Sequence, residues 1–267
     1  YLEQFMGGDG SSSGVSADVG NVLNTDAYAA MVADPNCFSM NQLKPGGYTP
    51  QFGGEIEDSS FIVGMKGEFG EWAYDVSYAT GNNKATFFLY NSLNPSLGLT
   101  GLDGGVAPTD FATGAYEQDE TTFNFDIVRL FTDVGFAQSV NFAAGFESRE
   151  ESFTITQGEE SSWVAGDYAA QGFNIGSHGF KGFGPEAAGS NSRDNIGMYV
   201  DVEAYMSDDL MLGTAIRYED FSSFGNTTDY KLTAQYSVND DLSLRASHTT
   251  GFRAPTVGQE NVVNTQT

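Results

Sequence analysis

Few side chains in this sequence could act in acid–base, nucleophilic or metal chemistry. Histidine occurs only at His178 and His248, and the one cysteine is Cys37. No segment has the spacing of a zinc site, a nucleophile elbow or a phosphate-binding loop. We expect His248 to be a polar residue at an interface rather than a catalytic base. The sequence therefore predicts no catalytic residue, no metal site and no cofactor.

Two pairs of adjacent carboxylates, Glu150-Glu151 and Glu159-Glu160, resemble an acid–base pair at first sight. Glycoside hydrolysis by a pair of carboxylates requires that the two groups face each other across the bond that is cleaved. Neighbouring residues of a strand point to opposite faces, so adjacency argues against this use. We expect these side chains to be solvated loop charges.

Non-covalent binding has better candidates, because bulky aromatics alternate with polar groups along one region. Aromatic faces suit sugars and planar chelates, and a few charged groups would fix the orientation of such a cargo. The alternative, which we favour, is that the aromatics pack the loop against itself or against the rim of the fold. The candidate residues are Phe153, Trp163, Tyr168, Phe173, Phe180 and Phe183, with Arg149, Glu151 and Arg193 as polar anchors.

The elements that must position these residues are strands, because apolar and polar residues alternate with a period of two. One face of the segment at 210–219 carries Leu210, Leu212, Thr214, Ile216 and Tyr218. About eight segments repeat this pattern, most with the roughly 9 to 11 residues that a tilted transmembrane strand needs. They lie near 61–69, 72–78, 123–127, 140–146, 196–206, 210–219, 230–238 and 242–247.

The pattern assigns one face of these strands to lipid. In a barrel, the apolar face points outward and the polar face lines the interior. The residues expected on the convex, lipid-facing side are Leu210, Leu212, Ile216, Leu232, Tyr236, Leu242 and Leu244. A soluble β-sandwich would also alternate, so the connections between strands are needed to decide between the two folds.

The connections alternate between short and long, as in outer-membrane barrels. Tight turns are expected at 70–71, 133–135, 207–209 and 239–241, all rich in turn-forming residues. Long stretches run from about Leu89 to Glu117 and from about Gln157 to Ser192, with a short link near 222–226. A β-sandwich does not require this regular alternation of short and long connections. Residues 1–57 then become mostly an extracellular loop, with a possible short helix at 22–32, and the barrel strands and loops occupy 58–267.

Composition and charge limit the classes of partner. The chain has 33 glycines and 36 acidic against 11 basic residues, for a net charge of −25. Such a charge opposes binding to nucleic acid and favours cationic or neutral partners, although solubility in a salty medium explains it equally well. No apolar run approaches the roughly 18 residues of a membrane-spanning helix, and no signal peptide is visible at the start. Cys37 has no partner within the chain, so it either pairs outside it or is a free thiol.

Several segments resemble one protein family in the same order along the chain. LSLRASHTTGFRAPTVGQ at 242–259 resembles the late-barrel segment of TonB-dependent outer-membrane receptors. Other matching segments are NSLNPSLG at 91–98, GFESREESFTITQGEESSW at 145–163, GFGPEAAGSNSRDNIGMYVDVE at 182–203 and RYEDFSSFGNTTDYKL at 217–232. The most specific part is the motif formed by Gly251, Phe252, Arg253, Ala254 and Pro255.

The resemblance implies an all-β fold, an antiparallel transmembrane meander that forms about eight strands of a 22-stranded barrel. It also implies energised uptake of a small-molecule cargo such as an iron-siderophore complex, cobalamin, haem or an oligosaccharide. The expected partners are the TonB system, which would act through a plug domain, and the lipid of the bacterial outer membrane. The sequence departs from a whole receptor because it shows neither a plug nor a TonB-contacting segment nor a terminal aromatic strand.

Two alternatives to an active receptor remain open at the level of sequence. A passive porin or a small structural barrel would show the same alternation, but it would need a complete, closed set of strands. A secreted soluble β protein or enzyme would remain in solution without detergent. The motif at 251–255 favours the receptor, of which this chain would be an interior part.

Overall fold

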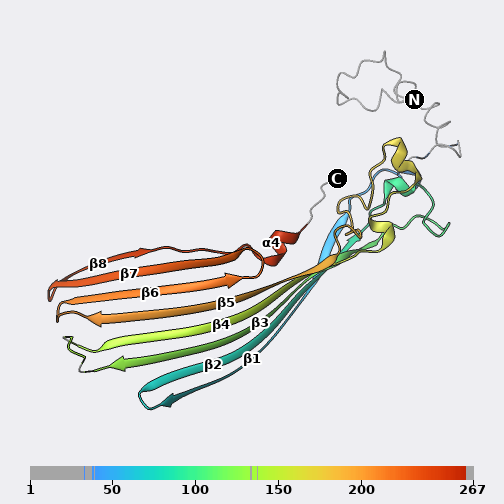
Figure 1. Cartoon of the computed structure of the whole chain (residues 1–267). Coiled ribbons are helices and arrows are strands. Elements are labelled where there is room, and N and C mark those ends of the chain that lie inside the picture. Colours follow the sequence, from blue (N-terminus) through green and yellow to red (C-terminus); the bar gives the residue numbers. More distant parts are fainter. Residues whose placement is uncertain (1–32, 34–37, 39, 133, 137, 263–267) are drawn as a thin grey trace.

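The computed structural model describes residues 33, 38, 40–132, 134–136 and 138–262. It forms one eight-stranded antiparallel sheet in which each strand pairs with the next along the chain (Figure 1). The predicted all-β meander is confirmed, and the sheet is open, with β1 and β8 at its edges. The strands are β1 (Gln51–Phe69), β2 (Trp72–Tyr90), β3 (Phe111–Phe131), β4 (Val140–Thr156), β5 (Gly189–Tyr205), β6 (Leu210–Phe221), β7 (Gly225–Asn239) and β8 (Leu242–Thr249).

The register of the strands sorts their side chains into two distinct faces. Residues that pair directly across neighbouring antiparallel strands lie on the same face. One row across β1 to β6 therefore consists of Met65, Val76, Phe125, Phe146, Met198 and Tyr218, on what we call the apolar face. The next row consists of Lys66, Asp75, Asp126, Gly145, Tyr199 and Arg217, on the polar face. The seven residues predicted to face lipid all lie on the apolar face.

The apolar face carries a belt that ends in aromatic residues on most strands. On β1 the belt runs from Phe69 to Phe61 and is followed by Ser59; on β3 it runs from Phe131 to Phe123 and is followed by Thr121. Such a run matches the roughly 9 to 11 residues needed to cross a bilayer at a tilt. The residues at the upper end of this apolar belt are Phe61, Tyr78, Phe123, Phe146, Ile196, Tyr218 and Tyr230.

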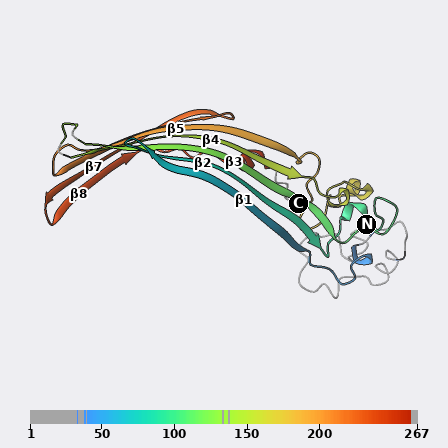
Figure 2. The same cartoon turned by 90° about the horizontal axis from the view of Figure 1, so that it is seen from below.

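Most strands are longer than the sequence pattern predicted. β1 to β5 contain 19, 19, 21, 17 and 17 residues, whereas β8 contains 8. The extra residues of β1 to β5 lie beyond the belt, where polar and apolar residues do not alternate regularly and no hydrophobic period marks a strand. Figure 1 shows the result: β1 to β5 continue to a cluster of loops, while β6 to β8 end earlier. Figure 2 shows that this long part of the sheet bends along its length.

The connections keep the predicted parity but differ in their limits. Residues 132–139 separate β3 from β4, so the tight turn expected at 133–135 is in fact a longer connection. The two long loops cover 91–110 and 157–188, because β3 and β5 begin earlier than expected. β1 begins at Gln51, inside the region that was expected to be loop up to residue 57.

The two long loops fold together into one unit, which we call the loop cap (residues 91–110 and 157–188). It contains the short 3-10 helices η2 (Pro95–Leu97), η3 (Glu160–Ser162) and η4 (Asp167–Gln171). A further 3-10 helix, η1 (Met40–Gln42), precedes β1. The interior of the cap is largely polar, with Ser92, Asn94, Ser96, Ser162 and Ser177 all buried. Because these groups are hydrogen-bonded within the chain, the cap is an ordered part of the fold rather than a pair of open loops.

The chain leaves β8 and forms α4 (Val257–Asn261), which contacts β4 and β5. Thr256 caps this helix: its hydroxyl accepts from the Gln259 N–H, and the Gln259 side chain accepts from the Thr256 N–H. This reciprocal capping satisfies two groups that a helix of five residues would otherwise leave unpaired.

The helix predicted at 22–32 and the single cysteine, Cys37, lie outside the described residues. Among the residues that the structure describes, no helix has the length and apolar character needed to cross a membrane.

Candidate functional site

The nine candidate binding residues fall into two groups. Glu151, Arg193 and Arg149 lie on the polar face of β4 and β5, where Glu151 pairs with Arg193 across the two strands. Phe153 lies on the same face of β4, and the other five aromatics belong to the loop cap. The sequence motif at 251–255, which follows β8, lies beside the first group. This contact crosses the sheet, because β6 and β7 lie between β5 and β8.

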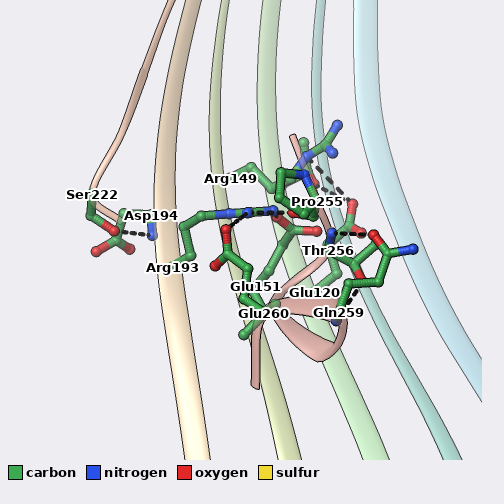
Figure 3. A network of polar contacts seen from close by, with 12 residues as sticks. Glu120, Arg149, Glu151, Arg193, Asp194, Ser222, Pro255, Thr256, Gln259 and Glu260 are labelled. Atoms are coloured by element: carbon green, nitrogen blue, oxygen red, sulfur yellow. Dashed lines mark hydrogen bonds and ion pairs between the residues drawn. The ribbon is translucent and has the colours of Figure 1, made fainter. Parts of the chain in front are cut away.

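Arg193 is the centre of a buried polar network (Figure 3). One terminal nitrogen, Nη2, donates to Glu151 Oε2 at 2.7 Å, and the other, Nη1, donates to the carbonyl oxygen of Pro255 at 2.6 Å. Glu260 Oε1, on α4, is 3.7 Å from Nη1. Only 3% of the Arg193 side chain and 11% of the Glu151 side chain are exposed. Arg193 therefore joins β4, β5 and the motif segment at one point.

Burying this charged pair is costly unless the hydrogen bonds are well formed. The geometry meets that condition at both terminal nitrogens, and the guanidinium also lies 5.5 Å from the ring of Phe221 and 5.8 Å from that of Phe224. The Nε atom is buried without a hydrogen-bond partner among the described residues. We conclude that Arg193 is used structurally, to hold the segment that follows β8.

The rest of the motif segment is held by packing. Phe252 lies 5.5 Å from Phe224, which stacks on Phe221 at 4.5 Å. Val257 is buried, and a Cβ atom at Gly258 would lie 3.1 Å from the ring of Phe153. The polar face is thus partly covered by residues 251–261, which we call the strap.

Arg149 begins a second set of ion pairs on the polar face. It lies 3.2 Å from Glu147 Oε1 and 3.6 Å from Glu120 Oε1. Arg217 continues the set, with Glu219 Oε1 at 2.9 Å and Glu147 Oε1 at 3.8 Å. The hydroxyl of Tyr199 donates to Asp126 Oδ1 at 2.7 Å. Arg149 remains 37% exposed, so it is the accessible charge of the three predicted polar anchors.

Three of the candidate aromatics, Phe153, Phe180 and Phe183, pack against residues of the strands next to the loop cap. Phe183 is buried and stacks on Tyr116 with 4.7 Å between ring centroids, and Phe153 lies 5.3 Å from the same tyrosine. Phe180 lies 4.5 Å from Phe52 on β1. These rings join the loop cap to the upper ends of β1, β3 and β4.

The other aromatics hold the loop cap together. Trp163 Nε1 donates to the Gly158 carbonyl at 3.1 Å. Tyr168 and Phe173 lie 5.9 Å apart, and both contact Phe38. All three remain partly exposed, which leaves part of each ring able to meet a ligand.

Both histidines have structural surroundings. His248 lies on the apolar face of β8, opposite Leu232, and its Nε2 is 3.3 Å from the Tyr230 hydroxyl. His178 belongs to the loop cap, where Nδ1 is 3.0 Å from the Tyr48 hydroxyl. Burial raises the pKa of Tyr48 above its usual value, so this hydroxyl is protonated at neutral pH.

Asn94, the most connected residue of the loop cap, was not singled out from the sequence. Its amide donates to the carbonyls of Ser161 and Val164, both at 2.9 Å, and its side-chain oxygen accepts from Ser96 and Gly176. The one signal was local: an asparagine before a proline is a good start for a short helix. No feature of the sequence indicated that Asn94 contacts residues roughly 70 positions away along the chain.

Within the described residues, no three His, Cys, Asp or Glu side chains gather in a way that could hold a metal ion. A family model described as "TonB dependent receptor-like, beta-barrel" matches residues 6–266. The chain belongs to this TonB-dependent receptor family. The resemblance seen in the sequence is thereby confirmed, as is the prediction that the chain is not an enzyme, because these barrels are receptors and transporters.

Relatives of this TonB-dependent receptor barrel agree with the assignment. The vitamin B12 transporter BtuB of Photobacterium profundum is 24% identical over 187 residues, which cover 70% of this chain and 27% of BtuB. The crystal structure of the siderophore receptor PirA from Acinetobacter baumannii matches with a TM-score of 0.51 and 14% identity, covering 76% of this chain and 26% of that one. The second match supports the fold alone. The chain thus spans about a quarter of the length of the relatives that it matches.

Proposed function

We propose that this chain is part of the wall of a longer bacterial outer-membrane receptor that takes up a scarce nutrient by TonB-driven transport. The observation that carries the proposal is the pairing of an apolar belt on one face with a charged face partly covered by the strap. A transport barrel needs lipid outside and a polar interior. Family membership adds the expectation of energised transport.

The partners follow from the same proposal. TonB would act through a plug domain encoded elsewhere in the longer receptor, and outer-membrane lipid would surround the apolar belt. The cargo would be a small molecule, and nucleic acid is excluded from the proposal by the net charge of −25. Cobalamin is the first cargo to test because of the similarity to BtuB, followed by iron-siderophore complexes, haem and oligosaccharides.

Cargo contact is proposed for the predicted residues that stay accessible. Phe153, Phe180, Arg149, Trp163, Tyr168 and Phe173 are partly exposed, whereas Phe183, Glu151 and Arg193 are buried within the fold. The accessible aromatics would offer ring faces to a planar or sugar-like cargo, and Arg149 would offer a charge. Their replacement should weaken cargo binding without unfolding the barrel.

The test is uptake by a strain in which the longer receptor gene is deleted and then restored. Labelled cobalamin, iron-siderophore complexes, haem and oligosaccharides are supplied in the presence and absence of TonB. We expect one cargo class to be taken up only when both the receptor and TonB are present. Uptake by the receptor that continues without TonB would favour the passive porin instead.

A matched pair of variants tests the cargo-contact residues. Trp163→Ala removes a ring that is partly exposed, whereas Phe61→Ala removes one from the apolar belt. Only the first should raise the cargo concentration needed for half-maximal uptake. Equal effects of both variants would show that the change acts through barrel stability.

A further inference from the structure

One cation interrupts the apolar belt. Arg129, on β3, pairs with Trp72 on one side and Phe142 on the other, which places it on the apolar face. It lies two residues before the end of the strand, at the side of the short connections. Among the described residues of the belt, no other lysine or arginine lies on this face. An isolated cation at such a place needs a reason, because a charge facing lipid is unfavourable away from the interface.

The surroundings of Arg129 combine aromatic rings with a carboxylate. The guanidinium carbon is 4.4 Å from the ring centroid of Phe131 and 5.5 Å from that of Trp72. Nη2 donates to a carboxylate oxygen of Glu71, in the turn between β1 and β2. The Arg129 side chain is 28% exposed, and that of Glu71 is 72% exposed. The charged groups are therefore held by the fold and open to the surroundings.

Arg129 has more hydrogen-bond capacity than the protein uses. A guanidinium has five N–H groups in a planar fork that matches phosphate. Within the described part of the chain, Glu71 is the acceptor for Nη2, and Nε is buried without a partner. The terminal N–H groups that Glu71 does not use can donate to an acceptor in the membrane interface. Tryptophan beside them is typical of the same depth, where headgroups meet acyl chains.

We propose that Arg129 and Glu71, flanked by Trp72, form a binding site for the headgroup of a zwitterionic aminophospholipid in the periplasmic leaflet. The lipid phosphate accepts from the Arg129 guanidinium, and the lipid ammonium group pairs with the Glu71 carboxylate. The acyl chains lie along the apolar belt. This inference rests on the proposed function, since it needs the sheet to stand in the outer membrane with its short connections in the periplasm.

The charge pattern selects this class of lipid. An anionic headgroup such as phosphatidylglycerol offers the phosphate but brings no cation for Glu71, and the carboxylate would repel it. A choline headgroup carries a charge that is hidden by methyl groups and cannot donate a hydrogen bond to Glu71. Phosphatidylethanolamine offers both a phosphate acceptor and an ammonium donor.

The test uses the complete receptor, purified in detergent and titrated with phosphatidylethanolamine, phosphatidylglycerol or phosphatidylcholine of the same acyl chains. Retained lipid is measured by native mass spectrometry. We expect the unmodified receptor to retain phosphatidylethanolamine about tenfold better than the other two lipids, the ratio for roughly one good charged hydrogen bond. Equal retention of all three lipids would overturn the proposal.

Three variants separate the two charges from general effects. Arg129→Gln should lower phosphatidylethanolamine retention to the level of the other lipids. Glu71→Gln, in an exposed turn, should raise phosphatidylglycerol retention until the preference is lost. Lys66→Gln removes an exposed cation from the polar face and should change nothing. A preference that survives both Arg129→Gln and Glu71→Gln would contradict the site.

Failure of the proposed function is recognised separately. Each variant is first fractionated from cells, and the receptor should be found in the outer membrane in a heat-modifiable, folded form. A receptor absent from that membrane would contradict the proposed function, and with it the site. A folded outer-membrane receptor without headgroup preference contradicts the site alone.

Discussion

At the scale of single residues, Arg193 links parts of the chain that are far apart in sequence. Its terminal nitrogens bind Glu151 on β4 and the carbonyl of Pro255 in the strap. Little of either the Arg193 or the Glu151 side chain is exposed to solvent, so each buried charge is stabilised mainly by its partner. A residue that was expected to anchor cargo is engaged in holding the family motif in place.

The first prediction concerns Arg193→Met. The change leaves the Glu151 carboxylate buried without its partner, which should destabilise the receptor by about 3–5 kcal/mol. Denaturant unfolding of the complete receptor in detergent measures the loss, and protease cleavage within 251–261 should become faster. Arg149→Met is the control, because Arg149 is partly exposed and its pairs should contribute about 0–1 kcal/mol. Equal losses in the two variants would contradict the assigned role of Arg193.

The second prediction concerns Asn94→Ala in the loop cap. The change leaves two carbonyls and two N–H groups without their buried partner, at about 1–3 kcal/mol for each group that water cannot reach. Amide hydrogen exchange should accelerate across 160–177. The matched control is Asn82→Ala, whose amide binds Glu117 and Asp119 at a more open position and should shift stability by less than about 0.5 kcal/mol. Unchanged exchange in the first variant would show that the cap does not depend on Asn94.

At the scale of elements, the two faces of each strand have different surroundings. On β6, the apolar face runs from Leu210 to Tyr218 with Thr214 at its centre. The polar face of the same strand carries Arg217 and Glu219, which are paired. A charge should therefore be tolerated on one face and not on the other.

The third prediction tests this difference with Leu212→Arg. An arginine at the centre of the bilayer costs about 2–4 kcal/mol on a lipid-facing strand, and the cost falls toward the interfaces. On the apolar face of β6, Leu212 is the residue next to the central Thr214. We therefore expect Leu212→Arg to cost about 2 kcal/mol, at the low end of this range. Refolding of the receptor into lipid vesicles at varied denaturant concentrations measures it. Ser247→Arg on the polar face of β8 should cost much less, and a similar cost for both would argue against the assignment of faces.

At the scale of the whole molecule, the sheet has two open edges. β1 pairs only with β2, and β8 only with β7, within the described residues. Unpaired backbone groups cannot remain unsatisfied in the hydrocarbon of a membrane. In a membrane, the outer edges of β1 and β8 would therefore each need a partner strand.

The fourth prediction concerns the 267 residues expressed alone. Without neighbours for β1 and β8, they should aggregate or be degraded, and they should not transport. The comparison is with the longer receptor expressed from the same promoter, measured by the folded fraction in the outer membrane and by uptake. Cargo-specific flux through the isolated chain would show that it is a complete transporter.

The sequence alone determined the strands within the belt and the side to which each residue points. Residues alternate with a period of two there because one face of each strand contacts lipid and must be apolar, whereas the other face lines the polar interior. Leu212, Leu232 and Leu244 could therefore be placed without a structure. The parity of the connections indicated an outer-membrane barrel, and the motif at 251–255, together with the other matching segments, carried the resemblance to the receptor family.

The tertiary structure decided what no local pattern encodes. In the upper parts of β1 to β5, polar and apolar residues do not alternate with a period of two, so no periodic pattern in the sequence separates these parts from loops. Arg193 meets Pro255 across 62 positions, and Gly176 meets Asn94 across 82. Such contacts depend on how strands and loops are arranged in space, because a hydrogen bond is decided by distance between groups and leaves no periodic trace in the sequence.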